Sequence, residues 1–282
     1  EAEGMNMEKV DIFKDIAERT GGDIYLGVVG PVRTGKSTFI KRFMELVVIP
    51  NITSEAEKAR AQDELPQSAT GKTIMTTEPK FVPNTAVKVK IEEGLEVSIR
   101  LVDCVGYAVV GAQGYTDENG PRMIHTPWYE EAIPFEEAAE IGTRKVIQEH
   151  STIGIIVTTD GSIGEIARHD YVQAEEQVVE EMKAVGKPFI LVLNSAQPYA
   201  TETEYLRQEL QNKYDIPVLA MGAESMNENE VLSILRESLY EFPVLEVNVN
   251  LPSWVMVLRE EHWLRQSFQN AVKDTVQDIK RL

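Results

Sequence analysis

The sequence predicts an α/β fold in which helices cover both faces of a mainly parallel sheet. Short apolar runs alternate with segments of helical periodicity, a pattern typical of parallel strands joined by right-handed crossovers. Two of the apolar runs are separated only by Glu92-Glu93-Gly94, which indicates a hairpin and adds one antiparallel strand. A loop bounded by Gly30 and Gly35 joins the first apolar run to the first helical segment.

The individual elements follow from the period of their apolar residues. The expected strands are 24–29, 86–91, 95–102, 153–158, 189–193 and 218–221. The expected helices are 36–48, 54–65, 135–149, 171–185, 204–213, 231–240 and 260–282. Ser54 and Glu57 fit a capping box at the start of helix 54–65, whose mostly alanine inner face should hold it loosely. Residues 106–134 are rich in glycine and proline and are expected to form a connecting stretch.

The chain is expected to contain one main domain and an extension. We take residues 1–6 as an expression remnant or an unstructured start, 7–242 as the main domain, and 243–282 as the extension. The terminal helix of the extension carries an apolar stripe: Leu264, Phe268, Val272, Thr275, Ile279 and Leu282. Such a stripe needs a partner, which could be a missing C-terminal region, another protomer or the body of the same domain.

Charge and cysteine content restrict the possible partners. The sequence has 28 Lys and Arg against 46 Asp and Glu, a formal net charge of −18. This charge argues against nucleic-acid binding and against broad adhesion to an anionic membrane. We expect no transmembrane segment, because no apolar run reaches the ~20 residues that a spanning helix needs. The single cysteine, Cys104, favours a reducing, cytoplasmic compartment.

Residues 30–38 carry the strongest motif in the sequence. They are Gly30, Pro31, Val32, Arg33, Thr34, Gly35, Lys36, Ser37 and Thr38, and the first eight fit G-x-x-x-x-G-K-[ST]. Because the motif lies between an apolar strand and an amphipathic helix, its backbone N–H groups can bind phosphate. Lys36 would contact the outer phosphate groups and the Ser37 hydroxyl would bind Mg²⁺. The motif therefore predicts a nucleoside triphosphate site, to which Arg33 could add charge.

A second motif, Asp103-Cys104-Val105-Gly106, follows the expected strand 95–102. Asp103 would hold Mg²⁺ through water, and the Gly106 N–H would contact the γ-phosphate. The segment 71–79 lies where a sensor of the γ-phosphate belongs, and it offers Thr76 and Thr77, with Thr77 as a metal ligand and Thr73 as a weaker candidate. Tyr107 occupies the position where related enzymes place a glutamine that orients water, so the attacking water must be positioned by another group.

The chain resembles the translation-factor-related class of P-loop NTPases, a GTPase-like fold that recognises guanine with N-K-x-D after a later strand. Here that strand is followed by Asn194, Ser195, Ala196 and Gln197, so the lysine and the aspartate are both replaced. The aspartate normally accepts two guanine N–H bonds of about 1.5–3 kcal/mol each. Their loss removes on the order of a hundred-fold of guanine preference, which favours ATP.

Longer stretches resemble the N-terminal ATPase region of the stage IV sporulation protein A family, spore-coat morphogenetic proteins of endospore-forming bacteria. The stretches are MEKVDIF at 7–13, VRTGKST at 32–38, RLVDCVGY at 100–107 and NLPSWVM at 250–256. By position, the resemblance implies that Lys36 is the phosphate-loop lysine, Asp103 the Mg²⁺-linked aspartate, and Thr76 and Thr77 the sensor threonines. Pro31 stands where a small residue such as alanine is expected, which removes one N–H from the loop.

The resemblance also implies a cellular role. Members of the family hydrolyse ATP and self-assemble into a static polymer in the mother-cell cytoplasm, at the forespore surface, as the basement layer of the spore coat. A small amphipathic membrane-anchoring peptide tethers them, they recruit other coat proteins, and they continue into further C-terminal regions. Together with the phosphate-loop motif, the resemblance thus implies a Mg²⁺-dependent ATPase whose hydrolysis drives conformational change and assembly. The alternatives are a GTPase-type switch, or a structural module that binds nucleotide without significant hydrolysis.

Overall fold

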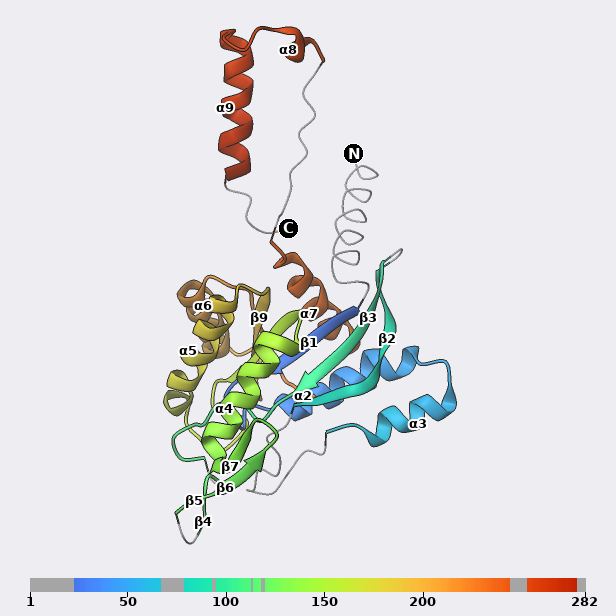
Figure 1. Ribbon diagram of the computed structural model, residues 1–282, viewed down its shortest axis with the longest axis vertical. Coiled ribbons are helices and arrows are strands. Elements are labelled where there is room, and N and C mark those ends of the chain that lie inside the picture. The colour runs from blue at the N-terminus through green and yellow to red at the C-terminus, as the bar shows by residue number, and fades with distance from the viewer. Residues whose placement is uncertain are drawn as a thin grey trace.

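The centre of the molecule is a six-stranded sheet in the order β10-β9-β8-β1-β3-β2 (Figure 1). The computed structural model describes residues 23–66, 79–92, 95–112, 114–117, 120–243 and 253–277. The strands of the sheet are β1 (Asp23–Val29), β2 (Lys80–Glu92), β3 (Leu95–Asp103), β8 (Ile153–Thr159), β9 (Phe189–Asn194) and β10 (Val218–Met221). All neighbours run parallel except β2 and β3, which are antiparallel. The predicted parallel sheet with one antiparallel hairpin strand is confirmed.

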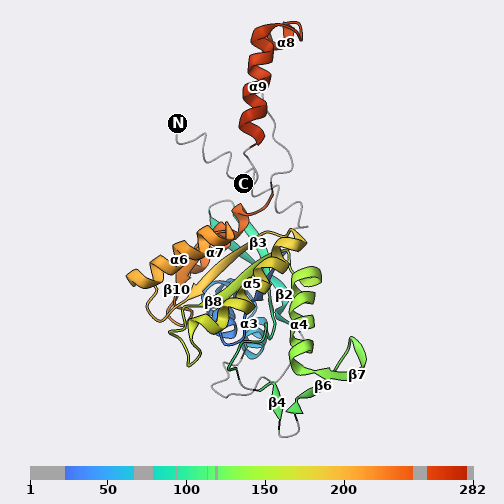
Figure 2. The same cartoon turned by 90° about the vertical axis from the view of Figure 1, so that its left-hand side faces the viewer.

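Helices cover both faces of this sheet, as predicted (Figure 2). They are α2 (Lys36–Phe43), η1 (Met44–Val48), η2 (Ile49–Asn51), α3 (Glu55–Asp63), α4 (Phe135–Lys145), η3 (Val146–His150), α5 (Arg168–Val185), α6 (Thr201–Tyr214) and α7 (Glu228–Tyr240). Side chains alternate along β1, so Leu26 and Val28 enter a core shared with α2 and α7. Val29 enters a second core, shared with α5 and α6.

The helix that follows the first strand is anchored by its apolar face. Phe39, Ile40 and Phe43 of α2 are fully buried, and each such side chain stabilises the fold by about 1.5–3 kcal/mol. The segment predicted as one helix, 36–48, is α-helical only to Phe43 and continues as the π-helical turn η1. A short 3-10 turn with Pro50 then ends the segment.

Two small hairpins occupy the stretch 106–134, which the sequence predicts only as a connection. Strands β4 (Thr116–Asp117) and β5 (Gly120–Pro121) pair with each other, and β6 (Met123–Thr126) pairs with β7 (Tyr129–Pro134). Figure 1 shows these hairpins projecting below α4. Strands β4 and β5 have two residues each, and the residues of β6 and β7 are mostly exposed or half-buried, so none of the four forms the buried apolar run that predicts a strand.

Three of the predicted helices start later than the observed ones, and for α7 the reason is an overlooked cap. Helix α7 begins at Glu228 rather than at 231, because Asn227 and Glu230 form a reciprocal capping box. Helices α5 and α6 also begin three residues earlier than predicted, at Arg168 and Thr201, although neither has a side-chain cap. In α3, Ser54 accepts a hydrogen bond from the Glu57 N–H, and Ala61 is its buried residue. The predicted weak attachment of this helix agrees with that small buried face.

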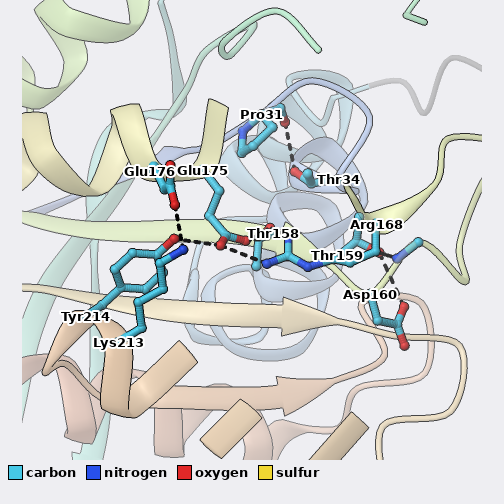
Figure 3. Close-up of polar contacts among 11 residues, drawn as sticks. Pro31, Thr34, Thr158, Thr159, Asp160, Arg168, Glu175, Glu176, Lys213 and Tyr214 are labelled. Atoms are coloured by element: carbon cyan, nitrogen blue, oxygen red, sulfur yellow. Dashed lines mark hydrogen bonds and ion pairs between the residues drawn. The ribbon is translucent and has the colours of Figure 1, made fainter. Parts of the chain in front are cut away.

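A buried carboxylate joins α5 to the sheet and to α6 (Figure 3). Glu175 is fully buried and accepts two hydrogen bonds from Arg168, at 2.7 and 2.8 Å. The hydroxyl of Thr158 on β8 and the hydroxyl of Tyr214 on α6 donate to the same carboxylate. Because Arg168, Thr158 and Tyr214 all donate to the carboxylate, the buried charge is paired, and loss of one of these partners would leave it partly uncompensated between three elements.

The extension forms two helices, α8 (Ser253–Val257) and α9 (Trp263–Gln277). Helix α9 lies within the predicted terminal helix, whereas α8 was not predicted. Phe268 of the apolar stripe packs edge-to-face on Trp254 of α8, with ring centroids 6.0 Å apart. One part of the stripe therefore has its partner in the preceding helix of the same chain. The end of the predicted helix, 278–282, lies outside the described residues.

Candidate active site

The phosphate loop leaves β1 in a conformation that only its glycines adopt without strain. Gly30 has a φ of +140°, and a Cβ there would lie 2.3 Å from the carbonyl oxygen of Val157. Gly35 has a φ of +90°, and a Cβ there would lie 2.3 Å from Nδ2 of Asn194. Arg33 is exposed at the turn of the loop with a φ of +60°. The sequence thus folds the backbone tightly around the space in front of α2.

Lys36 lies at the centre of this loop. Its Nζ donates to the carbonyl oxygens of Pro31 and Gly30, at 2.6 and 3.3 Å, and the residue is 5% exposed. Burial lowers the pKa of Lys36, while the nearby Cys104 and Asp103 act in the opposite direction. The Pro31 carbonyl also accepts from the buried Thr34 hydroxyl at 3.0 Å (Figure 3). Pro31 lacks an N–H, but its carbonyl orders the loop.

Asp103 and Ser37 meet beside the lysine. Asp103 ends β3, and the register places it opposite Val28 at the end of β1. The Ser37 hydroxyl donates to Oδ2 of Asp103 at 3.4 Å. Oδ1 of Asp103 is buried and has no hydrogen-bond partner among the described residues. Burial raises the pKa of Asp103 to about 6, although Lys36 acts to lower it. An unpaired carboxylate oxygen beside a hydroxyl is a donor set that suits Mg²⁺.

The D-x-x-G turn packs directly on the phosphate loop. Gly106 has a φ of +98°, and a Cβ there would lie 2.2 Å from the Gly30 oxygen and 2.5 Å from Nζ of Lys36. The Tyr107 N–H donates to the Gly30 oxygen at 3.2 Å, and the Tyr107 oxygen accepts from the Val32 N–H at 2.9 Å. The structure therefore brings together the two motifs that the sequence places on separate strands.

The side chain of Tyr107 points away from this turn. It is fully buried in the second core, and its hydroxyl donates to Glu181 of α5. This position explains in structural terms why residue 107 cannot orient a water molecule as a glutamine would. Sequence reasoning identified the missing glutamine but gave no signal for the contact with Glu181.

The segment 194–197 contributes less to a base pocket than its position in the sequence suggests. The Asn194 amide donates to the Thr34 oxygen at 2.9 Å and accepts from the Ala223 N–H at 2.9 Å, so it joins two loops. Ser195 is 1% exposed and donates to Oδ2 of Asp160 at 2.6 Å. Of the three residues predicted to read the base, Gln197 has the exposed side chain.

Asp160 was not predicted from the sequence. It follows β8, the strand beside β1, and its position at the carboxyl end of that strand was the available signal. Its carboxylate accepts from the Ser162 N–H and hydroxyl as well as from Ser195. Burial acts to raise the pKa of Asp160, but these hydrogen bonds lower it overall. Asp160 thus holds the loop after β8 against the segment that follows β9.

The predicted sensors of the γ-phosphate cannot be placed. Thr76 and Thr77, the predicted sensors, lie outside the described residues, as does Thr73. Thr38, the last residue of the predicted loop set, is half-buried in the first turn of α2. Within the described parts of the chain, no helix is both long and apolar enough to cross a membrane.

Fold and site together define a P-loop NTPase of the GTPase-like type: a phosphate loop between β1 and α2, and a D-x-x-G turn packed on it from β3. Residues 7–243 match the family described as stage IV sporulation protein A, ATPase domain, and residues 244–282 match its middle domain. The chain therefore belongs to the stage IV sporulation protein A family and carries its ATPase domain.

Three relatives have the same description, stage IV sporulation protein A. The protein of Bacillus subtilis (strain 168) is 78% identical over 276 residues, which are 98% of this chain and 56% of that protein. The Bacillus anthracis protein is 75% identical, with 98% and 56% covered. The Clostridioides difficile (strain 630) protein is 52% identical over 272 residues, with 96% and 55% covered. The chain thus spans about half the length of the curated relatives that it matches.

Among solved structures, the chain is similar to one described as the crystal structure of a mutation variant of SsGBP. The alignment covers 84% of this chain and 61% of that chain, with a TM-score of 0.42 and 14% sequence identity.

Proposed function

We propose that this domain binds Mg²⁺-ATP at the phosphate loop and hydrolyses it. The observation that carries the proposal is the buried, unpaired Oδ1 of Asp103, which lies beside Ser37 and the buried ammonium of Lys36. A buried carboxylate oxygen without a partner is costly unless a ligand uses it. Bound Mg²⁺ would use this oxygen, and the phosphate groups of ATP would use the lysine.

Each residue then has a defined task. Lys36 would place its charge against the outer phosphate groups, and the loop N–H groups would bind the remaining phosphate oxygens. Ser37 would hold Mg²⁺ directly and Asp103 through water, with Thr77 as a further ligand. The metal ion, when bound, would neutralise the negative charge that develops on the phosphate groups. The Gly106 N–H would contact the γ-phosphate, and Thr76 and Thr77 would sense it.

The contacts of the segment 194–197 support ATP as the nucleotide. Guanine needs a carboxylate that accepts its two N–H bonds, and residue 197 is a glutamine. Asp160, a carboxylate bonded to this segment, is already engaged by Ser162 and Ser195. Ser195 is buried and cannot cover a base as a lysine would. Gln197 can still hydrogen-bond to either base, so a GTPase-type switch is the second candidate.

Initial rates with ATP and with GTP test this assignment. We expect hydrolysis of ATP to exceed that of GTP at equal concentration, because the two charge-assisted bonds to guanine are lost. A clear preference for GTP would contradict the base assignment and favour the switch. Phosphate release no faster than that of Lys36→Ala would instead favour a structural module that binds nucleotide without hydrolysis.

Substituting Asp103 by asparagine should change activity and stability in opposite directions. We expect hydrolysis to fall at least about tenfold, because an amide binds Mg²⁺ more weakly than a carboxylate. In metal-free protein, burial raises the pKa of Asp103 to about 6. A raised folded-state pKa favours the native state at low pH, and this benefit is lost as the pH rises through about 6. Above that pH, Asp103→Asn should therefore be more stable than wild type, by roughly 1–3 kcal/mol.

Melting temperatures at pH 5 and pH 8 in a chelating buffer measure this difference. The exposed Asp63 of α3 offers a matched control, because Asp63→Asn removes the same charge from solvent-exposed surface. A lower melting temperature for Asp103→Asn than for wild type at pH 8 would show that the buried carboxylate stabilises the fold instead.

We propose further that hydrolysis drives a conformational change and self-assembly into the basement layer of the spore coat. The description of the family as a sporulation protein supports a role at the spore. The resemblance supports the finer steps: a homopolymer, a small amphipathic membrane-anchoring peptide, other coat proteins as partners, and a place in the mother-cell cytoplasm at the forespore surface.

Sedimentation tests the link between hydrolysis and assembly. This chain and a chain of the relatives' full length would be compared with ATP, with a non-hydrolysable analogue and without nucleotide. We expect the longer chain to sediment with ATP and to remain in the supernatant with the analogue. Equal sedimentation in all three conditions would contradict the coupling.

A further inference from the structure

Tyr107 connects the D-x-x-G turn to the phosphate loop through its backbone on both sides. Its N–H donates to the Gly30 oxygen at 3.2 Å, and its own oxygen accepts from the Val32 N–H at 2.9 Å. The two segments run side by side here as a short parallel bridge between Pro31 and Tyr107. The turn therefore cannot leave the phosphate loop unless both hydrogen bonds break.

The side chain of Tyr107 fixes the same turn from the opposite direction. It is among the largest fully buried side chains of the molecule, and it packs in the core under α5. Its hydroxyl donates to Glu181 of α5, and Glu181 in turn accepts from Arg144 of α4 at 3.2 Å. Burial, followed by the bond to Glu181, raises the pKa of Tyr107 well above its usual range, so the hydroxyl remains a donor.

Gly106 is the residue whose position depends on this anchor. A glycine at φ +98° has many other backbone conformations available, because it lacks a Cβ. Here it is held close to the Gly30 oxygen and to Nζ of Lys36, where a Cβ would lie 2.2 and 2.5 Å from those atoms. The neighbouring tyrosine removes this freedom, since it is pinned at its backbone, its ring and its hydroxyl.

We propose that Tyr107, through Glu181, is a positioning residue that holds Gly106 beside Gly30 and Lys36 of the phosphate loop and so sets the preference for nucleoside triphosphate over diphosphate. The inference rests on the proposed nucleotide site, in which Gly106 contacts the third phosphate group. In place of a glutamine that reaches the water, this chain has a buried tyrosine that fixes the turn. The same contacts connect the site to α4 and α5.

The test compares the affinities for Mg²⁺-ATP and Mg²⁺-ADP, measured by displacement of a fluorescent ADP analogue, together with kcat and KM. Tyr107→Phe keeps the ring and loses the bond to Glu181. We expect its ATP affinity and its kcat to fall about three- to tenfold, the effect of one hydrogen bond, while its ADP affinity stays within about twofold of wild type. Glu181→Ala should behave in the same way, and the double variant should lose no more than either single variant.

Two variants separate positioning from general structural damage. Glu181→Gln retains an oxygen that accepts from Tyr107, so its ATP to ADP ratio should stay within about twofold of wild type. Tyr214→Phe loses a matched hydrogen bond, from a buried tyrosine to Glu175 on the same helix α5 at 2.8 Å (Figure 3). It should lower the melting temperature without changing the ratio.

The inference is overturned if Tyr107→Phe weakens ATP and ADP binding equally, or if Tyr214→Phe changes the ratio as much. A failure of the proposed function has a different signature, since wild type would then bind neither the fluorescent ADP analogue nor the two adenine nucleotides. If wild type binds a fluorescent GDP analogue instead, the same variants are compared with GTP and GDP, and the two criteria above apply unchanged.

Discussion

Replacing Lys36 by alanine is expected to abolish nucleotide hydrolysis, with a loss on the order of 10²–10³-fold or more. Lys36 is 5% exposed, and its ammonium lies among the loop carbonyls, where little water screens its charge. The chain as a whole has a formal net charge of −18, so attraction of a polyanion depends on such local groups. Without Lys36, the loop would retain its N–H dipoles and the exposed Arg33, but no buried charge among its carbonyls to meet the outer phosphate groups.

Binding should be lost together with turnover. A ligand that binds only the native state raises the free energy of unfolding, by about 2.7 kcal/mol at a concentration of a hundred times its Kd. The melting temperature rises with it. We expect wild type to show this rise with Mg²⁺-ATP and Lys36→Ala to show none. Lys41→Ala is the matched control, because Lys41 lies on the same helix with a side chain 43% exposed, 3.9 Å from Glu45. A nucleotide-induced rise that is equal in Lys36→Ala and wild type would contradict the central role of this lysine.

The fold was predictable because most strands of its central sheet are continuous apolar runs and its main turn is marked by glycines that are close together in the sequence. Strands such as β8 and β9 are fully buried apolar runs, and the glycines of the phosphate loop mark a turn that tolerates no side chain. The hairpins β4–β5 and β6–β7 were missed, because β4 and β5 have two residues each and β6 and β7 are mostly exposed or half-buried and so show no apolar run. The start of α7 was missed for a different reason: the capping pair Asn227 and Glu230 precedes the first apolar residue of the helix.

The candidate site was predictable only where its residues are neighbours in sequence. The phosphate loop and the D-x-x-G turn each have a recognisable spacing, and the parallel register of β1 with β3 then brings them together. The contact between Tyr107 and Glu181 joins positions 74 residues apart, and nothing in the local pattern of α5 distinguishes Glu181 from the other acidic residues of that helix. Ser195 was predicted to face the nucleotide, whereas the structure turns it towards Asp160.

Replacing Gly106 by alanine should be nearly as damaging as the loss of Lys36, although it removes no functional group. A Cβ at this position would lie 2.2 Å from the backbone oxygen of Gly30 and 2.5 Å from Nζ of Lys36. The first contact is with backbone, so the turn itself must move away from the phosphate loop. We expect hydrolysis to fall at least about a hundred-fold, because the lysine and the γ-phosphate contact are displaced together.

Gly111 provides the control that isolates this clash from backbone strain. It also has a positive φ, +83° against +98° for Gly106, but a Cβ there would meet nothing within 4 Å. Both alanine variants carry the same left-handed strain, of roughly 1–2 kcal/mol, so both should lower the melting temperature. Only Gly106→Ala should lose hydrolysis, with Gly111→Ala within about threefold of wild type. Similar steady-state rates for the two variants would mean that the D-x-x-G turn can leave the phosphate loop without loss of activity, and that the close packing of Gly106 on Lys36 is not required for hydrolysis.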